Sequence, residues 1–78
     1  MRAVIDNKEV FIKTHAVKRA RQRNIFPSMV YATLNGGEIK RFGKNLLKIS
    51  KRYKKGKVIC IGEDVGSYII IKTIEWGN

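Results

Sequence analysis

The sequence predicts a single α+β domain, in which a short N-terminal strand or hairpin is followed by two helices and then by a three- to four-stranded antiparallel meander. Three observations predict this class. Two short apolar runs separated by turn residues begin the chain, a helix-compatible stretch follows them, and the second half is rich in Ile, Val, Tyr and Trp. Because 78 residues can bury only one small core, we expect residues 1–78 to form one domain.

The N-terminal segment is expected to be a strand, a turn and a second strand, which could pair as a hairpin. Val4-Ile5 and Val10-Phe11-Ile12 are the two apolar runs. Asp6 and Asn7 lie between them, and both residue types are typical of tight turns.

Two helices are expected next. Thr14 can cap the first by accepting a hydrogen bond from a backbone N–H two or three residues on, and no Gly or Pro interrupts the chain before Arg23. Asn24 tolerates the left-handed conformation at a helix end. Pro27 suits the first turn of a second helix, which Asn35-Gly36-Gly37 should end.

The second half is expected to form the antiparallel strands. They are predicted over residues 38–42, 45–53, 57–63 and 68–76. The runs 58–61 and 69–71 are apolar on both faces, which predicts positions in the middle of the sheet. The strand over 45–53 alternates instead, and so presents Lys48, Ser50 and Arg52 on the face opposite its buried residues.

The charge is concentrated and strongly positive. Seventeen Lys and Arg face six acids, a net charge of +11, and fourteen of the seventeen lie within residues 13–57, where Glu38 is the only acid. Such an excess repels itself and is best tolerated where a polyanion neutralises it, so nucleic acid is the expected partner. The alternatives are solubility and a basic interface for an acidic protein.

Other classes of protein are disfavoured by composition. The apolar runs are too short to cross a bilayer, and the N-terminus lacks the pattern of a signal peptide, so no membrane association and a cytoplasmic location are expected. The lone Cys60 lies in an apolar run and is expected to be buried, not a nucleophile. With one cysteine and one histidine, no metal site or cofactor is expected.

The candidate catalytic residues are His15, Arg19 and Arg23, which follow one another at four-residue steps along the first helix. Cleavage of RNA needs a proton acceptor for the 2′-OH, a proton donor for the leaving oxygen and fixed cations for the charged phosphorane. An imidazole titrates near neutral pH and can serve as base or acid. Spacing alone favours the alternative, in which His15 makes only a local hydrogen bond.

Further cations are candidates for binding nucleic acid. They lie on the first helix, on the strand over 45–53, around the following hairpin tip and in the last strand: Lys18, Arg21, Lys48, Arg52, Lys54, Lys55, Lys57 and Lys72. Residues 51–57 hold five cations, which would grip phosphates without reading bases. Aromatic residues, Tyr31, Phe42, Tyr53 and Tyr68, could stack on unpaired bases, although core packing is their commoner use.

Four segments form a recognisable pattern: Thr14-His15-Ala16 with Arg19, Arg23-Asn24-Ile25-Phe26-Pro27, Gly37-Glu38-Ile39 and Ile71-Lys72-Thr73-Ile74. In these segments the chain resembles the small domain-of-unknown-function family numbered DUF 4258. The resemblance covers nearly the whole chain from Thr14. Two departures are Asn24 in place of a usual glycine and a second helix that begins without the common acids.

The resemblance implies a RelE-like or barnase-like toxin fold, similar in layout to RelE, colicin D and BrnT-like toxin nucleases, and a metal-independent ribonuclease site at His15, Arg19 and Arg23. The leading hypothesis is therefore a small RNA-binding endoribonuclease of the toxin type, or a derivative of one, with RNA favoured over DNA. A noncatalytic nucleic-acid-binding or regulatory module is the second hypothesis. The third is a basic partner of an acidic protein such as an antitoxin.

Overall fold

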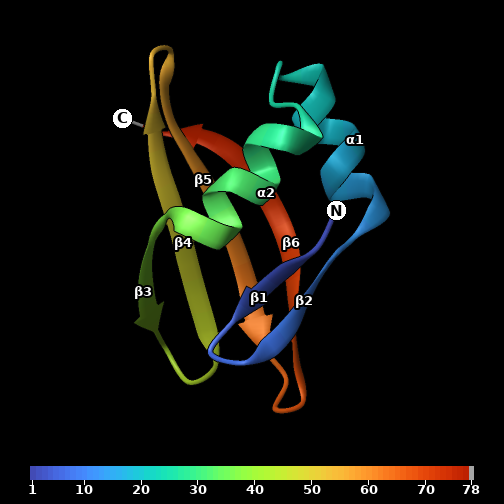
Figure 1. Ribbon diagram of the computed structural model, residues 1–78, viewed down its shortest axis with the longest axis vertical. Helices are drawn as coiled ribbons and strands as arrows, with labels where there is room; N and C mark the ends of the chain where they lie inside the picture. The colour runs from blue at the N-terminus through green and yellow to red at the C-terminus, as the bar shows by residue number, and fades with distance from the viewer. Residues whose placement is uncertain (78) are drawn as a thin grey trace.

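The structure is a computed structural model that describes residues 1–77 (Figure 1). Its elements, in chain order, are β1 (Ala3–Ile5), β2 (Lys8–Ile12), α1 (Thr14–Gln22), α2 (Pro27–Gly36), β3 (Glu38–Phe42), β4 (Leu46–Tyr53), β5 (Gly56–Asp64) and β6 (Tyr68–Gly77). The N-terminal hairpin, with Asp6 and Asn7 at positive φ in its turn, lies where it was predicted. The expectation that β5 and β6 lie in the middle of the sheet is also confirmed.

The predicted architecture is wrong. The N-terminal hairpin is not separate from the antiparallel strands, as a RelE-like or barnase-like layout requires. All six strands form one mixed sheet, in the order β1-β2-β6-β5-β4-β3, that curls into half a barrel. The deciding contact is parallel pairing of β2 with β6, in which Val10 lies opposite Ile69 and Ile12 opposite Ile71. Pairing between segments this far apart leaves no local pattern in the sequence, so it was missed.

The two helices cover the concave side of this sheet (Figure 1). α2 packs against β1, β4 and β5, and so spans the open side of the half-barrel. The Asn35 side chain holds it there, because its Oδ1 accepts from the Val4 N–H at 3.3 Å and its Nδ2 donates to the Arg2 carbonyl at 3.0 Å. Neither α1 nor α2 is long and apolar enough to span a membrane, and residues 1–77 contain no other helix.

The ends of the helices follow the predictions with one exception. Asn24 has a φ of 62° just after α1, and Pro27 opens α2, both as expected. Thr14 is not a cap: it is the first helical residue, Lys13 precedes it in extended conformation, and no side chain caps the helix. The Lys13 N–H instead donates to the Ile71 carbonyl at 3.0 Å, so the chain enters α1 directly from the sheet.

The core lies between the concave side of the sheet and the helices. Its largest fully buried side chains come from the α1–α2 loop, from α2 and from the inner sides of the strands: Ile25, Val30, Thr33, Leu34, Leu47, Ile49, Val58, Cys60, Ile69, Ile71 and Ile74. Cys60 was expected to be buried and is, and burial raises the pKa of its thiol to about 12. A thiol with this pKa is not a nucleophile at neutral pH.

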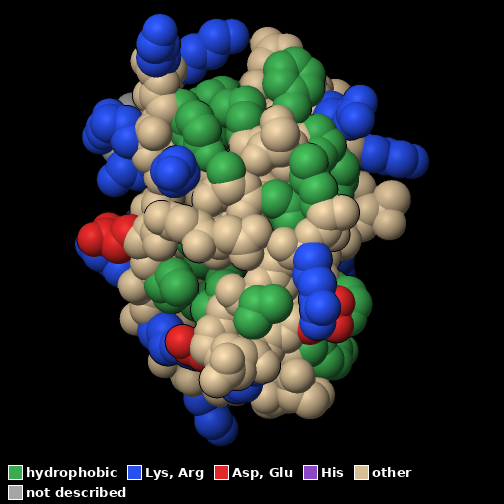
Figure 2. Space-filling model, in the orientation of Figure 1, with side chains coloured by type: hydrophobic (Ala, Val, Ile, Leu, Met, Phe, Trp, Pro, Cys, Tyr) green, Lys and Arg blue, Asp and Glu red, His purple; other side chains and the backbone are tan. Residues whose placement is uncertain are grey.

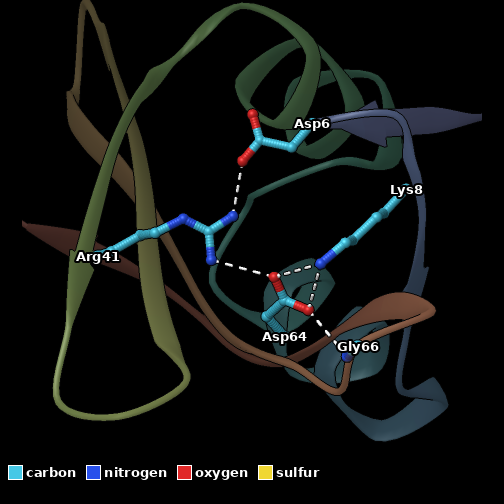
Figure 3. Close-up of polar contacts among 5 residues, drawn as sticks. All are labelled: Asp6, Lys8, Arg41, Asp64 and Gly66. Atoms are coloured by element: carbon cyan, nitrogen blue, oxygen red, sulfur yellow. Dashed lines mark hydrogen bonds and ion pairs between the residues drawn. The ribbon is translucent and has the colours of Figure 1, made fainter.

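A cluster of charged side chains joins the two edges of the sheet (Figure 3). The Asp64 carboxylate accepts hydrogen bonds from Lys8 Nζ at 2.9 Å and from Arg41 Nη1 at 3.1 Å, and it also accepts from the Gly66 N–H. Arg41 Nη2 reaches Asp6 at 2.6 Å. Because Asp6 lies in the β1–β2 turn and Arg41 on β3, at opposite edges of the sheet, these contacts require the sheet to be curled.

Candidate phosphate-binding site

The site lies where α1 runs along the part of β6 that β2 does not reach. β2 pairs with β6 only as far as Ile71, so the edge of β6 beyond that residue is covered by α1. Two hydrogen bonds fix the end of the helix there: Arg23 Nη1 donates to the Ile74 carbonyl at 2.9 Å, and Trp76 Nε1 donates to the Arg23 carbonyl at 2.6 Å. The helix and the strand therefore hold their facing side chains at a fixed separation.

A β-bulge brings Lys72 into this region. Ile61 pairs with Thr73 and Gly62 pairs with Ile71, so Lys72 is the extra residue in β6. A bulge changes the direction of the side chain it carries. The Lys72 ammonium lies 2.7 Å from Glu63 Oε1, with 45% of the lysine side chain exposed.

The facing side chains of α1 and β6 enclose a small hollow of about 90 Å³. The residues that line it are His15, Ala16, Arg19, Arg23, Lys72, Thr73, Ile74 and Glu75. The structure thus brings together His15, Arg19 and Arg23, the three residues that were predicted from helical spacing, and adds Lys72. A hollow of this size suits a small polar group and is too small for a drug-sized ligand.

The hollow favours an anion. Within residues 1–77 neither Arg19 nor Arg23 forms an ion pair, and a guanidinium has five N–H donors, of which Arg23 gives one to Ile74. Arginine donors of this kind match the oxygens of a phosphate. His15 is exposed and faces the same hollow, so a bound phosphate would meet both the cations and the imidazole.

Sequence reasoning missed Glu75. Glu75 is half-buried and lines the hollow from β6, so a carboxylate residue and the histidine both line this site. Strand alternation places Glu75 on the same side of β6 as Thr73, but only the packing of α1 along β6 brings Glu75 to the hollow, and that packing leaves no local pattern in the sequence. A carboxylate and an imidazole in one hollow can act as an acid–base pair.

Comparisons of the chain with protein-family models, with curated proteins and with solved structures gave no match. The resemblance to the DUF 4258 family therefore stays a prediction. What the chain can do follows from its own geometry.

The other predicted cations do not line this hollow. Lys18 and Arg21 are exposed elsewhere on α1. Lys48, Arg52 and Lys57 lie on the face of β4 and β5 that the helices leave uncovered, but the Ser50 hydroxyl predicted to accompany them is buried. Lys54 and Lys55, at the tip of the β4–β5 hairpin, line a second and larger hollow.

A metal ion has no evident place among the described residues. No group of three His, Cys, Asp or Glu side chains within residues 1–77 is arranged to hold one. The charged and titratable residues that line the hollow are Arg19, Arg23, Lys72, His15 and Glu75.

Proposed function

We propose that this protein binds RNA and that the hollow between α1 and β6 holds one phosphate of the bound strand. The observation that carries this proposal is the convergence of Arg19, Arg23 and Lys72 on one hollow, beside the only histidine of the chain. The net charge of +11 supports it, because phosphates release counterions when lysine and arginine side chains replace them.

We further propose that the site cleaves the strand in the manner of a metal-independent, toxin-type endoribonuclease. Glu75 takes the proton of the 2′-OH, whose oxygen attacks phosphorus, and the bond from phosphorus to the 5′-oxygen breaks. Protonated His15 gives its proton to that leaving oxygen, so the products are a 2′,3′-cyclic phosphate and a free 5′-OH. The arginines stabilise the added negative charge of the phosphorane.

The test is incubation of the protein with labelled RNA in EDTA, beside the His15→Ala variant. We expect cleavage by the native protein and a cleavage rate at least about 100-fold lower in the variant, because positioned acid–base groups contribute at least that factor. RNA with a 2′-deoxy nucleotide at the cleaved position should resist. Binding by both proteins without cleavage would refute the enzyme and leave a noncatalytic nucleic-acid-binding module.

A salt series separates the remaining alternative, a basic interface for an acidic, antitoxin-like protein. RNA affinity should fall steeply and log-linearly as NaCl is raised, with a slope that reports the number of phosphates contacted. Arg19→Ala should make this slope shallower by about one phosphate. A salt-independent association, or no association with RNA at low salt, would contradict RNA binding.

A further inference from the structure

A second hollow, of about 310 Å³, opens at one end of the molecule. It lies between the α1–α2 loop, the first turn of α2, the tip of the β4–β5 hairpin and the end of β6, and its lining residues are Asn24, Phe26, Met29, Tyr53, Lys54, Lys55 and Trp76. Figure 2 shows hydrophobic side chains exposed between the lysine-bearing hairpin tip and the α1–α2 loop. Within residues 1–77, no residue lines both this hollow and the proposed phosphate site.

The aromatic walls of the hollow are held in place. The Tyr53 hydroxyl donates to the Met29 carbonyl at 3.0 Å and lies 3.1 Å from Thr33 Oγ1. The Trp76 indole N–H is bonded to the Arg23 carbonyl. Phe26 stands at the rim with half of its surface exposed, although exposure of a large apolar ring is unfavourable. The hollow is therefore preformed and has flat apolar surfaces.

The charged side chains that line the hollow favour a negatively charged ligand. Lys54 and Lys55 are its only charged lining residues, and within residues 1–77 neither forms an ion pair. A cationic ligand would be repelled, and an uncharged one would leave the lysines without a role. The chemistry that fits is a flat, apolar group that carries negative charge beside it, which describes a nucleotide.

The hollow also adjoins the phosphate site. Glu75 lines the small hollow and Trp76 the large one, so consecutive residues of β6 line the two hollows. The side chain of Arg23 lines the first, and its carbonyl accepts from the indole that lines the second. Arg23 therefore connects the two hollows, so the Trp76 ring lies beside the residue proposed to hold a phosphate.

We propose that the large hollow receives an unpaired nucleobase of single-stranded RNA, stacked on Phe26 or Trp76 while Lys54 and Lys55 hold the adjacent phosphate. This inference rests on the proposed RNA-binding function and adds a requirement for exposed bases. It predicts a preference for single strands, because the bases of a duplex are paired and stacked on one another.

The experiment uses Trp76, the only tryptophan of the chain, as its probe. The protein is titrated with a short 2′-O-methyl oligoadenylate, which cannot be cleaved by attack of its own 2′ oxygen, and with an abasic strand that has the same number of phosphates. We expect the oligoadenylate to quench Trp76 fluorescence and to bind about fivefold to 150-fold more tightly than the abasic strand, since stacking of one base is worth about 1–3 kcal/mol.

A pair of matched variants locates the effect. Phe26→Ala should reduce the ratio of the two affinities toward one, and Phe42→Ala, a change at a similarly exposed phenylalanine on β3, should leave the ratio unchanged. Equal binding of both strands without quenching would overturn the base pocket and leave the RNA-binding function standing. If both strands fail to bind at low salt, RNA binding itself is overturned, and the base pocket with it.

Discussion

Asp64 accepts hydrogen bonds from three separate parts of the chain: Lys8 of β2, Arg41 of β3 and the backbone of Gly66. Only 11% of its side chain is exposed. These contacts, led by the bond from Lys8, lower the pKa of the carboxyl to about 2 from an ordinary 3.8. One carboxylate thus connects the two edges of the half-barrel.

The lowered pKa predicts how acid affects stability. Because Asp64 binds its proton more weakly in the folded state, its carboxylate stabilises the fold above about pH 4, and this contribution is lost as the pH falls from 4 toward 2. Asp64→Asn should lower the thermal midpoint at pH 7 and flatten its dependence on pH in that range. Asp6→Asn, which removes a more exposed partner of Arg41, is the control with the smaller effect. Parallel acid profiles for Asp64→Asn and the native protein would contradict this account.

At the same scale, helical spacing predicted that His15, Arg19 and Arg23 share one side of α1, and the structure places all three at one hollow. Residue patterns could not show what faces that side. Lys72 reaches it because of a bulge, and Glu75 because α1 lies along the edge of β6. Both depend on pairings between distant parts of the chain. Their use in catalysis stays a prediction.

The bulge in β6 is the element on which Lys72 depends, and Gly62 lies opposite it. A Cβ on Gly62 would lie 2.5 Å from the Ile70 carbonyl oxygen and 2.8 Å from Ile71 Cδ1. A backbone oxygen within a central pair of strands cannot move aside. The absence of a side chain at Gly62 therefore allows β5 and β6 to approach one another where the register shifts.

Gly62→Ala should accordingly destabilise the protein by about 1–3 kcal/mol, as inserted methyl groups do in packed cores. For a domain of this size each kcal/mol lowers the thermal midpoint by about 4–8 °C. Gly36→Ala makes the same change at the end of α2, where the nearest atom to a new Cβ is Lys51 Nζ at 3.8 Å. We expect that control to be neutral or slightly stabilising. A Gly62→Ala variant as stable as Gly36→Ala would contradict the close approach.

The whole molecule shows where local patterns are sufficient and where they are not. Turn residues, Pro27 and apolar alternation located nearly every helix and strand, because each of these signals acts within a few residues. The sheet order was not predictable in the same way. β2 is apolar at Val10, Phe11 and Ile12, a pattern equally suited to an isolated hairpin and to a strand beside β6. The segment between β2 and β6 makes up most of the chain and contains both helices and three strands, so no local signal connects the two strands.

Because the molecule is strongly charged, salt has two opposite effects on the stability of the folded state. Residues 1–77 contain five ion pairs, which salt weakens, but exposed pairs are worth only about 0–1 kcal/mol each. Salt also screens the mutual repulsion of seventeen cations that only six acids offset. Repulsion involves many more pairs of charges than attraction does, so screening should stabilise the folded state.

We therefore expect the urea midpoint to rise as NaCl is raised from low to physiological concentration, and to rise further when sulfate supplies anions for the cationic hollows. Lys44→Glu, at an exposed turn that lines neither hollow, should raise the midpoint at low salt and reduce its rise with NaCl. Urea titrations of the native protein and of the Lys44→Glu variant, repeated at each salt concentration, measure both effects. A midpoint that falls with NaCl would show that the ion pairs around Asp64 outweigh the repulsion, and that the excess of positive charge needs no polyanion to be tolerated.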